Sequence, residues 1–152
     1  MSRFANLWIH RMDIRPLTPD YAVAPQIDPA DIAAIKAAGF TTVIDNRPDS
    51  EIPRHLHAIT MRVAVEAAGL AFVVNPVIGG QMTMQNVEAQ AAAMAESAGP
   101  VLAYCASGNR CSVVWALAQA GQMPTDDLIA LPARYGYALE GLRAQIEALA
   151  RR

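Results

Sequence analysis

The stretch A-Y-C-A-S-G-N-R-C-S-V (residues 103–113) contains the residue types best suited to chemistry in this chain. It places Cys105, Gly108 and Arg110 between a strand-like run, V-L-A-Y, and a helix-like run, V-V-W-A-L-A. In such a connection, the backbone N–H groups of the loop and of the first helical turn lack intrahelical partners and form a concave site for an anion. Gly108 allows the positive φ that turns these amides inward, and Arg110 supplies a planar set of donors for a tetrahedral oxyanion.

Cys105 would lie at the opening of this loop, close to the helix N-terminus and to Arg110. Both favour the thiolate, and in comparable sites they lower a cysteine pKa from about 8.5 to ~3.5–7.5. We therefore expect Cys105 to be a nucleophile at neutral pH, and we prefer this interpretation to that of a small buried hydrophobic residue. The loop residues expected to bind the oxyanion together with Arg110 are Ala106, Ser107, Gly108, Asn109 and Cys111.

The rest of the chain must position this loop, and it alternates short apolar runs with helical segments. Strands are expected at 21–24, 40–45, 71–76 and 101–104. A helical segment is expected after each strand, and three helices are expected after the last strand, over 111–120, from 125 and over 139–150. This alternation predicts a single α/β domain over residues 12–152, with a mainly parallel central sheet flanked by helices, and an N-terminal arm at residues 1–11. Ligands of such sheets bind beyond the carboxyl ends of the strands, where Cys105 would lie.

Composition excludes several classes of partner. The chain has 152 residues, is 53% hydrophobic and has a formal net charge of −2, which suits one buried core but gives no broad basic surface for nucleic acid or an anionic membrane. We find neither a membrane-spanning apolar run nor a signal peptide, so a cytoplasmic location is expected. Two cysteines and three scattered histidines fit neither a disulfide framework nor a structural zinc site, and we expect no metal or cofactor. The sequence does not indicate an oligomeric state.

The run C-A-S-G-N-R resembles the signature loop of the cysteine-based phosphatases and of the rhodanese-type sulfurtransferases. More closely, the chain resembles a small bacterial phosphatase-like family that is also found fused to β-lactamase-like hydrolases. The similar stretches cover residues 12 to the C-terminus and include M-D-I-R-P-L-T, A-A-G-F-T-T-V-I-D-N-R-P-D, P-V-I-G-G and G-P-V-L-A-Y-C-A-S-G-N-R-C-S-V-V-W. This resemblance implies a dual-specificity-phosphatase-like α/β fold, with Cys105 as nucleophile and Arg110 binding the oxyanion.

Three features differ from a fully equipped tyrosine phosphatase. Such enzymes place five residues between the cysteine and the arginine, whereas four separate Cys105 from Arg110, which is also the rhodanese length. Their general acid usually follows the preceding strand, and V-I-G-G-Q-M-T has no carboxylate there. Cys111 stands where Ser or Thr usually assists the thiolate, and it is open to three interpretations: a weaker S–H partner, a redox partner of Cys105, or a tolerated exchange.

A substitute general acid could come from Asp45, Asp49 or Glu51, on the connection after the 40–45 strand. General acids commonly contribute ~10²–10⁴-fold to a rate. We favour Asp49 because it lies farther out on the loop, whereas Asp45 and Arg47 are more simply explained by a salt bridge or a cap. The residues expected at the rim of the site are Asp45, Arg47, Gly79 and Gly80.

Three functions are compatible with these residues. The first is a cysteine-dependent phosphatase-like hydrolase that acts on phosphate monoesters through a phosphocysteine intermediate. The second is a rhodanese-like sulfurtransferase that carries a persulfide on Cys105, which the short loop and the missing acid favour. The third is a non-catalytic oxyanion-binding domain. We rank them in this order, and in each case the expected partner is a small oxyanion or phosphoester.

Overall fold

The computed structural model describes residues 13–152, so the predicted N-terminal arm lies outside the described residues and its boundary stays a prediction. These residues form a five-stranded sheet in the order β1-β2-β5-β3-β4. The strands are β1 (Arg15–Thr18), β2 (Tyr21–Ala24), β3 (Thr42–Asp45), β4 (Ala71–Val74) and β5 (Val101–Tyr104). All neighbouring pairs are parallel except β1 and β2. The predicted single α/β domain with a mainly parallel sheet is confirmed. The antiparallel edge strand β1, which contains a proline, was not predicted.

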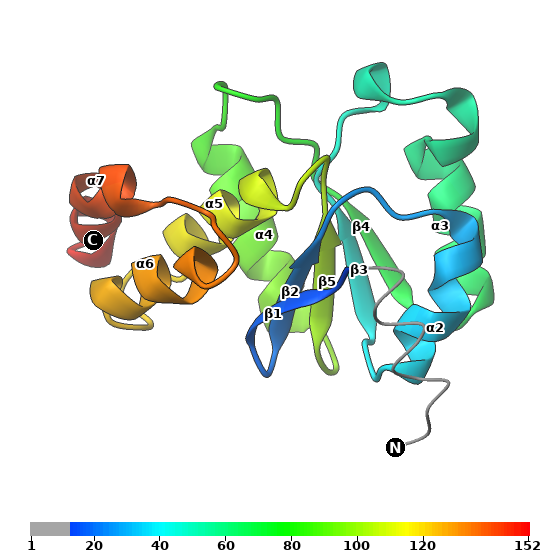
Figure 1. The fold of residues 1–152 in the computed structure, drawn as a ribbon, viewed down its shortest axis with the longest axis horizontal. Helices are drawn as coiled ribbons and strands as arrows, with labels where there is room; N and C mark the ends of the chain where they lie inside the picture. The colour runs from blue at the N-terminus through cyan, green and yellow to red at the C-terminus, as the bar shows by residue number, and fades with distance from the viewer. Residues whose placement is uncertain (1–12) are drawn as a thin grey trace.

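The helices form layers on both faces of the sheet, as Figure 1 shows. One face is covered by α2 (Ile32–Ala37) and α3 (Ala58–Ala67), and the other by α4 (Met84–Glu96) and α5 (Asn109–Ala118). Beyond α5 lie α6 (Thr125–Ala133) and α7 (Arg143–Ala150). The described residues also contain four short 3₁₀ helices: η1 (Pro29–Asp31), η2 (Asp49–Glu51), η3 (Arg54–Leu56) and η4 (Glu140–Leu142). No helix within residues 13–152 is long and apolar enough to cross a membrane.

The central strands are buried on both faces, which explains their nearly continuous apolar sequence. In β3, Val43 packs with the α2–α3 layer and Ile44 packs with the layer of α4 and α5. In β5, Leu102 and Ala103 alternate in the same way. This period of two residues directs successive side chains into two separate cores, so that the sheet is fixed from both sides.

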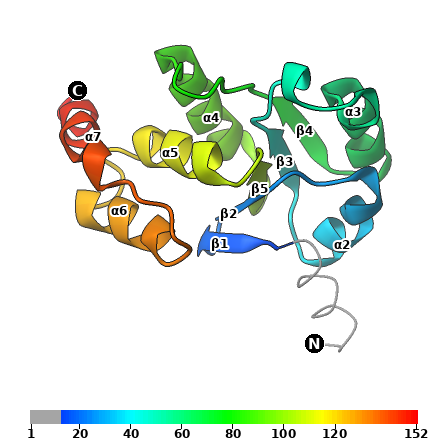
Figure 2. The same ribbon diagram turned by 45° about the horizontal axis from the view of Figure 1, so that its top comes forward.

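The carboxyl ends of β2, β3, β4 and β5 share one edge of the sheet because these four strands are parallel. Figure 2 brings this edge forward and shows the connections after β3 and β4 rising beside the β5–α5 connection. Strand β5 lies between β2 and β3 in the sheet. The loop that contains Cys105 therefore stands at the middle of the edge where ligands of such sheets bind.

Candidate active site

The β5–α5 loop has the conformation expected for an anion site. Gly108 is the N-cap residue of α5 and has a φ of 94°, in the left-handed region that glycine adopts without strain. Its N–H donates to Sγ of Cys105 at 3.1 Å. Cys105 itself is buried, whereas Ala106, Ser107 and Asn109 are exposed. The sulfur therefore lies at the base of the loop rather than at its opening.

The loop favours the thiolate form of Cys105. Its pKa is lowered to about 5, first by a hydrogen bond from the Cys111 side chain and then by the backbone N–H groups of Cys111, Gly108 and Ser107, which together outweigh burial. Burial raises the pKa of Cys111, so that thiol keeps its proton and is able to donate. The Cys111 thiol comes first among the groups that lower the pKa of Cys105, which favours the S–H partner among the three interpretations of Cys111.

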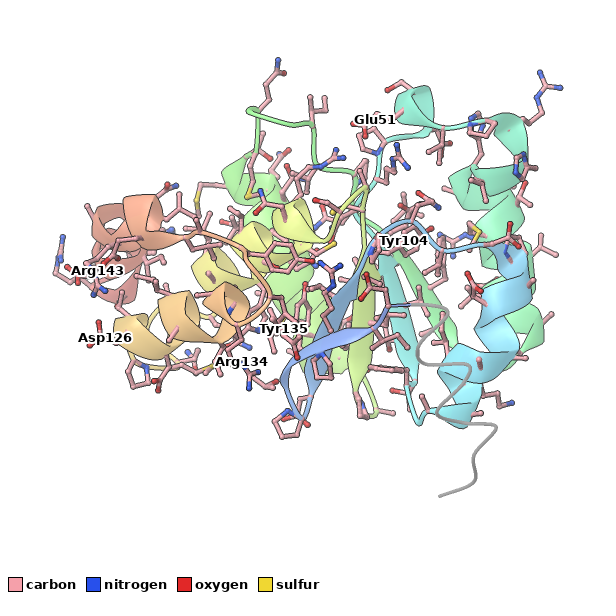
Figure 3. All side chains as sticks on the ribbon, viewed as in Figure 1. Glu51, Tyr104, Asp126, Arg134, Tyr135 and Arg143 are labelled. Atoms are coloured by element: carbon pink, nitrogen blue, oxygen red, sulfur yellow. The ribbon has the colours of Figure 1, made fainter. Side chains whose placement is uncertain are left out.

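Arg110 makes a two-pronged ion pair with Glu51. Its Nη1 and Nη2 donate to the two carboxylate oxygens of Glu51 at 2.8 Å each, and Nη1 also donates to the carbonyl oxygen of Val77 at 2.8 Å. This pair lowers the pKa of the Glu51 carboxyl, which is therefore ionised at neutral pH. Figure 3 shows Glu51 above the carboxyl edge of the sheet, on η2. The pairing joins the connection after β3 to the start of α5.

A second edge of the Arg110 guanidinium is available for an oxyanion. A guanidinium has five N–H donors, and the three bonds to Glu51 and Val77 use both hydrogens of Nη1 and one of Nη2. Within residues 13–152, Nε and the second hydrogen of Nη2 have no hydrogen-bond acceptor. These two donors form the edge that binds carboxylate and phosphate groups side-on, so Arg110 can contact Glu51 and an oxyanion at the same time.

Residues 13–122 match the model of a protein family described as "Beta-lactamase hydrolase-like protein, phosphatase-like domain". The chain belongs to this family. A beta-lactamase hydrolase-like protein from Xylella fastidiosa is 31% identical over 130 residues, which make up 84% of this chain and 30% of that protein. The chain thus spans less than a third of the length of that relative. The resemblance to the bacterial phosphatase-like family is confirmed.

Solved structures place the phosphatase-like domain among the phosphatase folds. The crystal structure of a candidate phosphatase from Neisseria meningitidis superimposes with a TM-score of 0.75 at 31% identity, covering 91% of this chain and 99% of that one. The active form of Tk-PTP superimposes with a TM-score of 0.72 at 15% identity, covering 91% and 97% of the two chains. The second likeness concerns the fold alone. Together they confirm the predicted cysteine-phosphatase-like architecture.

The carboxylates near the site of this phosphatase-like domain differ in their surroundings. Asp45 is fully buried, its Oδ1 accepts the backbone N–H of Arg47 at 2.9 Å, and burial raises its pKa to about 6. Asp49 is half exposed, with Oδ1 accepting the N–H of Ala58 at 2.8 Å and Oδ2 lying 3.9 Å from Nδ1 of His57. Both oxygens of Glu51 contact Arg110. Asp49 is thus the one carboxylate of these three whose side chain is exposed and has an oxygen that contacts no arginine.

The expected rim residues lie in different places. Asp45 caps the turn that follows β3, because its Oδ1 accepts the backbone N–H of Arg47. The Arg47 side chain forms an ion pair with Glu51 at 3.3 Å rather than with Asp45. Gly80 lines a cavity of about 340 Å³ that begins at Asn109 and Arg110 and runs along α5. Gly79 is exposed and does not line this cavity. The other lining side chains are mostly apolar and include Val77, Met82, Val113, Leu117 and Leu142.

Below the loop, a buried group of amide side chains joins the strand ends. Gln90 on α4 donates to Asn46 and to the hydroxyl of Tyr21 at 3.0 Å each, and accepts from Asn46 and Asn75. Tyr21 in turn donates to the carbonyl oxygen of Cys111 at 2.9 Å. Every member has a partner, which rigidifies such a network. The floor of the site is therefore fixed from three strands and one helix.

The sequence did not indicate the partners of the loop. The Glu51–Arg110 pair spans 59 positions, and a contact from Tyr137 to Ser107 spans 30. Neither pair has a local sequence signal, because both depend on how the elements pack.

Within residues 13–152 no three His, Cys, Asp or Glu side chains cluster in a way that could bind a metal ion.

Proposed function

We propose that this phosphatase-like domain hydrolyses phosphate monoesters with Cys105 as the nucleophile. The observation that carries the proposal is the Cys105 sulfur with its lowered pKa, which accepts the Gly108 N–H in the loop that leads to Arg110. An oxyanion at this loop would meet backbone donors and a guanidinium, the groups that stabilise charge developing on a transferring phosphoryl group.

The proposed reaction has two steps. The Cys105 thiolate attacks phosphorus, the P–O bond to the alcohol breaks, and the leaving oxygen takes a proton from Asp49. Water then attacks the phosphocysteine, gives a proton to the Asp49 carboxylate, and releases inorganic phosphate and the Cys105 thiolate. Arg110 and the loop amides bind the non-bridging oxygens in both steps. Exposure of Asp49 and the occupation of Glu51 by Arg110 support this assignment of the acid.

Hydrolysis of an aryl phosphate by the purified protein, compared with Cys105→Ser, tests the proposal. We expect turnover that the variant lacks, and kcat/KM that rises with pH through about 5 as Cys105 ionises. A protein that releases phosphate no faster than the variant contradicts the proposal. Trapping of phosphate on the Cys105 peptide by rapid acid quench and mass spectrometry would identify the intermediate.

A separate comparison tests Asp49. Asp49→Asn keeps an oxygen for the Ala58 N–H and removes only the transferable proton. We expect a large loss of kcat with phenyl phosphate and a small loss with an activated ester whose leaving group needs no proton. Equal losses on both esters would contradict the acid role.

The cavity along α5 supports an apolar alcohol as the leaving group. It starts at Asn109 and Arg110, where the phosphate would bind, and its walls are mostly aliphatic or methionine side chains. Aryl and alkyl phosphates should therefore have higher kcat/KM than sugar phosphates. A preference for sugar phosphates would contradict this assignment.

Sulfur transfer remains the second candidate, favoured by the four residues between Cys105 and Arg110. A persulfide on Cys105 after incubation with thiosulfate, detected by mass spectrometry together with thiocyanate formation from cyanide, would support it. Phosphate release without either product supports the phosphatase.

A further inference from the structure

Tyr137 contacts the β5–α5 loop from outside the anion site. It lies after α6, and its hydroxyl donates to the carbonyl oxygen of Ser107 at 2.7 Å. That carbonyl and the N–H of Gly108 belong to one peptide unit, and the same N–H donates to Sγ of Cys105. Because a trans peptide is planar and its C=O and N–H point in opposite directions, the bond from Tyr137 determines where the Gly108 N–H points.

The contact is close enough to require glycine at position 108. A Cβ added to Gly108 would overlap the Tyr137 hydroxyl oxygen and would lie 3.1 Å from its Cζ. The hydroxyl thus occupies the space that the missing side chain leaves. The left-handed φ and the close approach of Tyr137 both require glycine, and both act on the peptide that faces Cys105.

Arg15 orients the Tyr137 hydroxyl. Its Nη1 donates to the hydroxyl oxygen at 2.7 Å, and its guanidinium carbon lies 5.6 Å from the centre of the ring. The hydroxyl therefore accepts from a cation while it donates to Ser107, an arrangement that strengthens the second bond. Burial raises the pKa of Tyr137, so the hydroxyl keeps the proton that it donates.

We propose that Tyr137, oriented by Arg15, is a positioning residue that aims the Gly108 N–H at the Cys105 sulfur by fixing the Ser107 carbonyl on the opposite side of the loop. Without the hydroxyl, the Ser107–Gly108 peptide can rotate, and the sulfur loses a donor that favours its thiolate. The catalytic meaning of this contact rests on the proposed role of Cys105, but its effect on the sulfur can be measured without turnover.

The experiment measures the pKa of Cys105 from the ultraviolet absorbance of its thiolate during a pH titration, with Cys105→Ser as the background. Tyr137→Phe removes only the hydroxyl. Tyr135→Phe is the matched control, because the Tyr135 hydroxyl donates to the carbonyl oxygen of Pro16 at 2.7 Å and lies beside β1, as Figure 3 shows. The other titratable or charged groups near Cys105 are Tyr21, Arg110 and Cys111, and these variants leave all three in place.

We expect Tyr137→Phe to raise the pKa of Cys105 by about one unit, which lowers the thiolate fraction about five-fold at pH 5 and leaves it unchanged at pH 8. Arg15→Gln should shift the pKa in the same direction by a smaller amount, and Tyr135→Phe should not shift it. An unchanged Cys105 pKa in Tyr137→Phe, or an equal shift in Tyr135→Phe, overturns the proposal.

Two further outcomes separate the questions. Loss of the near-ultraviolet circular dichroism of Tyr137→Phe would mean that this variant does not fold. Arg15→Gln then tests the proposal, because it keeps the tyrosine ring and its hydroxyl. An unchanged pKa of Cys105 in Arg15→Gln overturns the proposal. If the protein releases no phosphate from any ester but shows the expected pKa shifts, the phosphatase proposal is contradicted and the positioning role of Tyr137 is supported.

Discussion

Two connections at the carboxyl edge of the sheet contribute to the site in different ways. The β5–α5 loop surrounds the side chain of Cys105 with backbone donors, and the buried Gly108 donates its N–H to the Cys105 sulfur. The connection from β3 to α3 contributes side chains, with Glu51 on Arg110 and Asp49 on the start of α3. Backbone donors are as rigid as the fold around them, whereas exposed side chains can change without disturbing it. Substitutions in the β5–α5 loop should therefore change both the stability of the protein and its activity. Substitutions of exposed side chains in the connection from β3 to α3 should change the activity with little effect on stability.

Gly108→Ala should have the largest effect. The left-handed backbone costs an alanine about 1–2 kcal/mol, and contact of its Cβ with Tyr137 adds overpacking, for a total of about 3 kcal/mol. Chemical denaturation measures this loss. Gly136→Ala is the control, because Gly136 has a φ of +90° but no atom within 4 Å of an added Cβ. Equal losses in the two variants would mean that packing around the loop does not stabilise it.

Arg110→Lys should lower kcat about 100-fold on an aryl phosphate. An ammonium group has three donors on one nitrogen, so it cannot bind Glu51 and an oxyanion each through two parallel hydrogen bonds, as the two edges of the guanidinium can. Steady-state kinetics at saturating substrate measures the effect. A variant with nearly unchanged kcat would show that Arg110 serves only to bind Glu51.

Asp45→Asn should stabilise the protein by about 2 kcal/mol at pH 8. Burial raises the pKa of Asp45 to about 6, so its stabilising contribution is present below the unfolded pKa and is lost as the pH rises through about 6. Asparagine can keep the acceptor for the Arg47 N–H and has no charge to bury. Denaturation from pH 4 to pH 8 should show the advantage growing with pH. A constant difference across this range would contradict the buried charge as its cause.

Glu51→Gln should have the smallest effect, about a ten-fold loss of kcat with little change in stability. The loss follows because glutamine offers one acceptor where the carboxylate offers two to Arg110. Glu66→Gln is a matched control, since Glu66 pairs with Arg62 on α3 and is exposed. An increase in kcat, or a lower KM, would mean that Glu51 competes with the substrate for Arg110.

The sequence predicted what depends on neighbours along the chain. A β-branched or apolar run followed by Cys105, Gly108 and a helix predicts the strand, the loop with its left-handed glycine and the helix without reference to other elements, whereas anion binding by the loop stays a prediction. The partners of that loop could not be predicted in this way. Glu51 reaches Arg110 because β3 lies beside β5 in the sheet, and Tyr137 reaches Ser107 because the segment after α6 lies beside the loop.

Asp45 shows a second limit of the sequence. Its position at the end of a strand was compatible with the rim or with an acid, since the pattern of residues does not reveal depth. The structure buries it fully, in register with Tyr104 of β5. Burial is set by the layers on both sides of the sheet, and these are tertiary properties.

The hydrogen bonds of the Gln90 amide affect how this protein unfolds. Because one residue of α4 bonds to Tyr21 of β2 and to Asn46 and Asn75 after the carboxyl ends of β3 and β4, α4 cannot detach without breaking the floor below the β5–α5 loop. Amides of these strand ends should then exchange with solvent deuterium only at the rate of global unfolding, as part of one cooperative unit. Gln90→Leu should release them into a faster, local opening while the sheet stays folded.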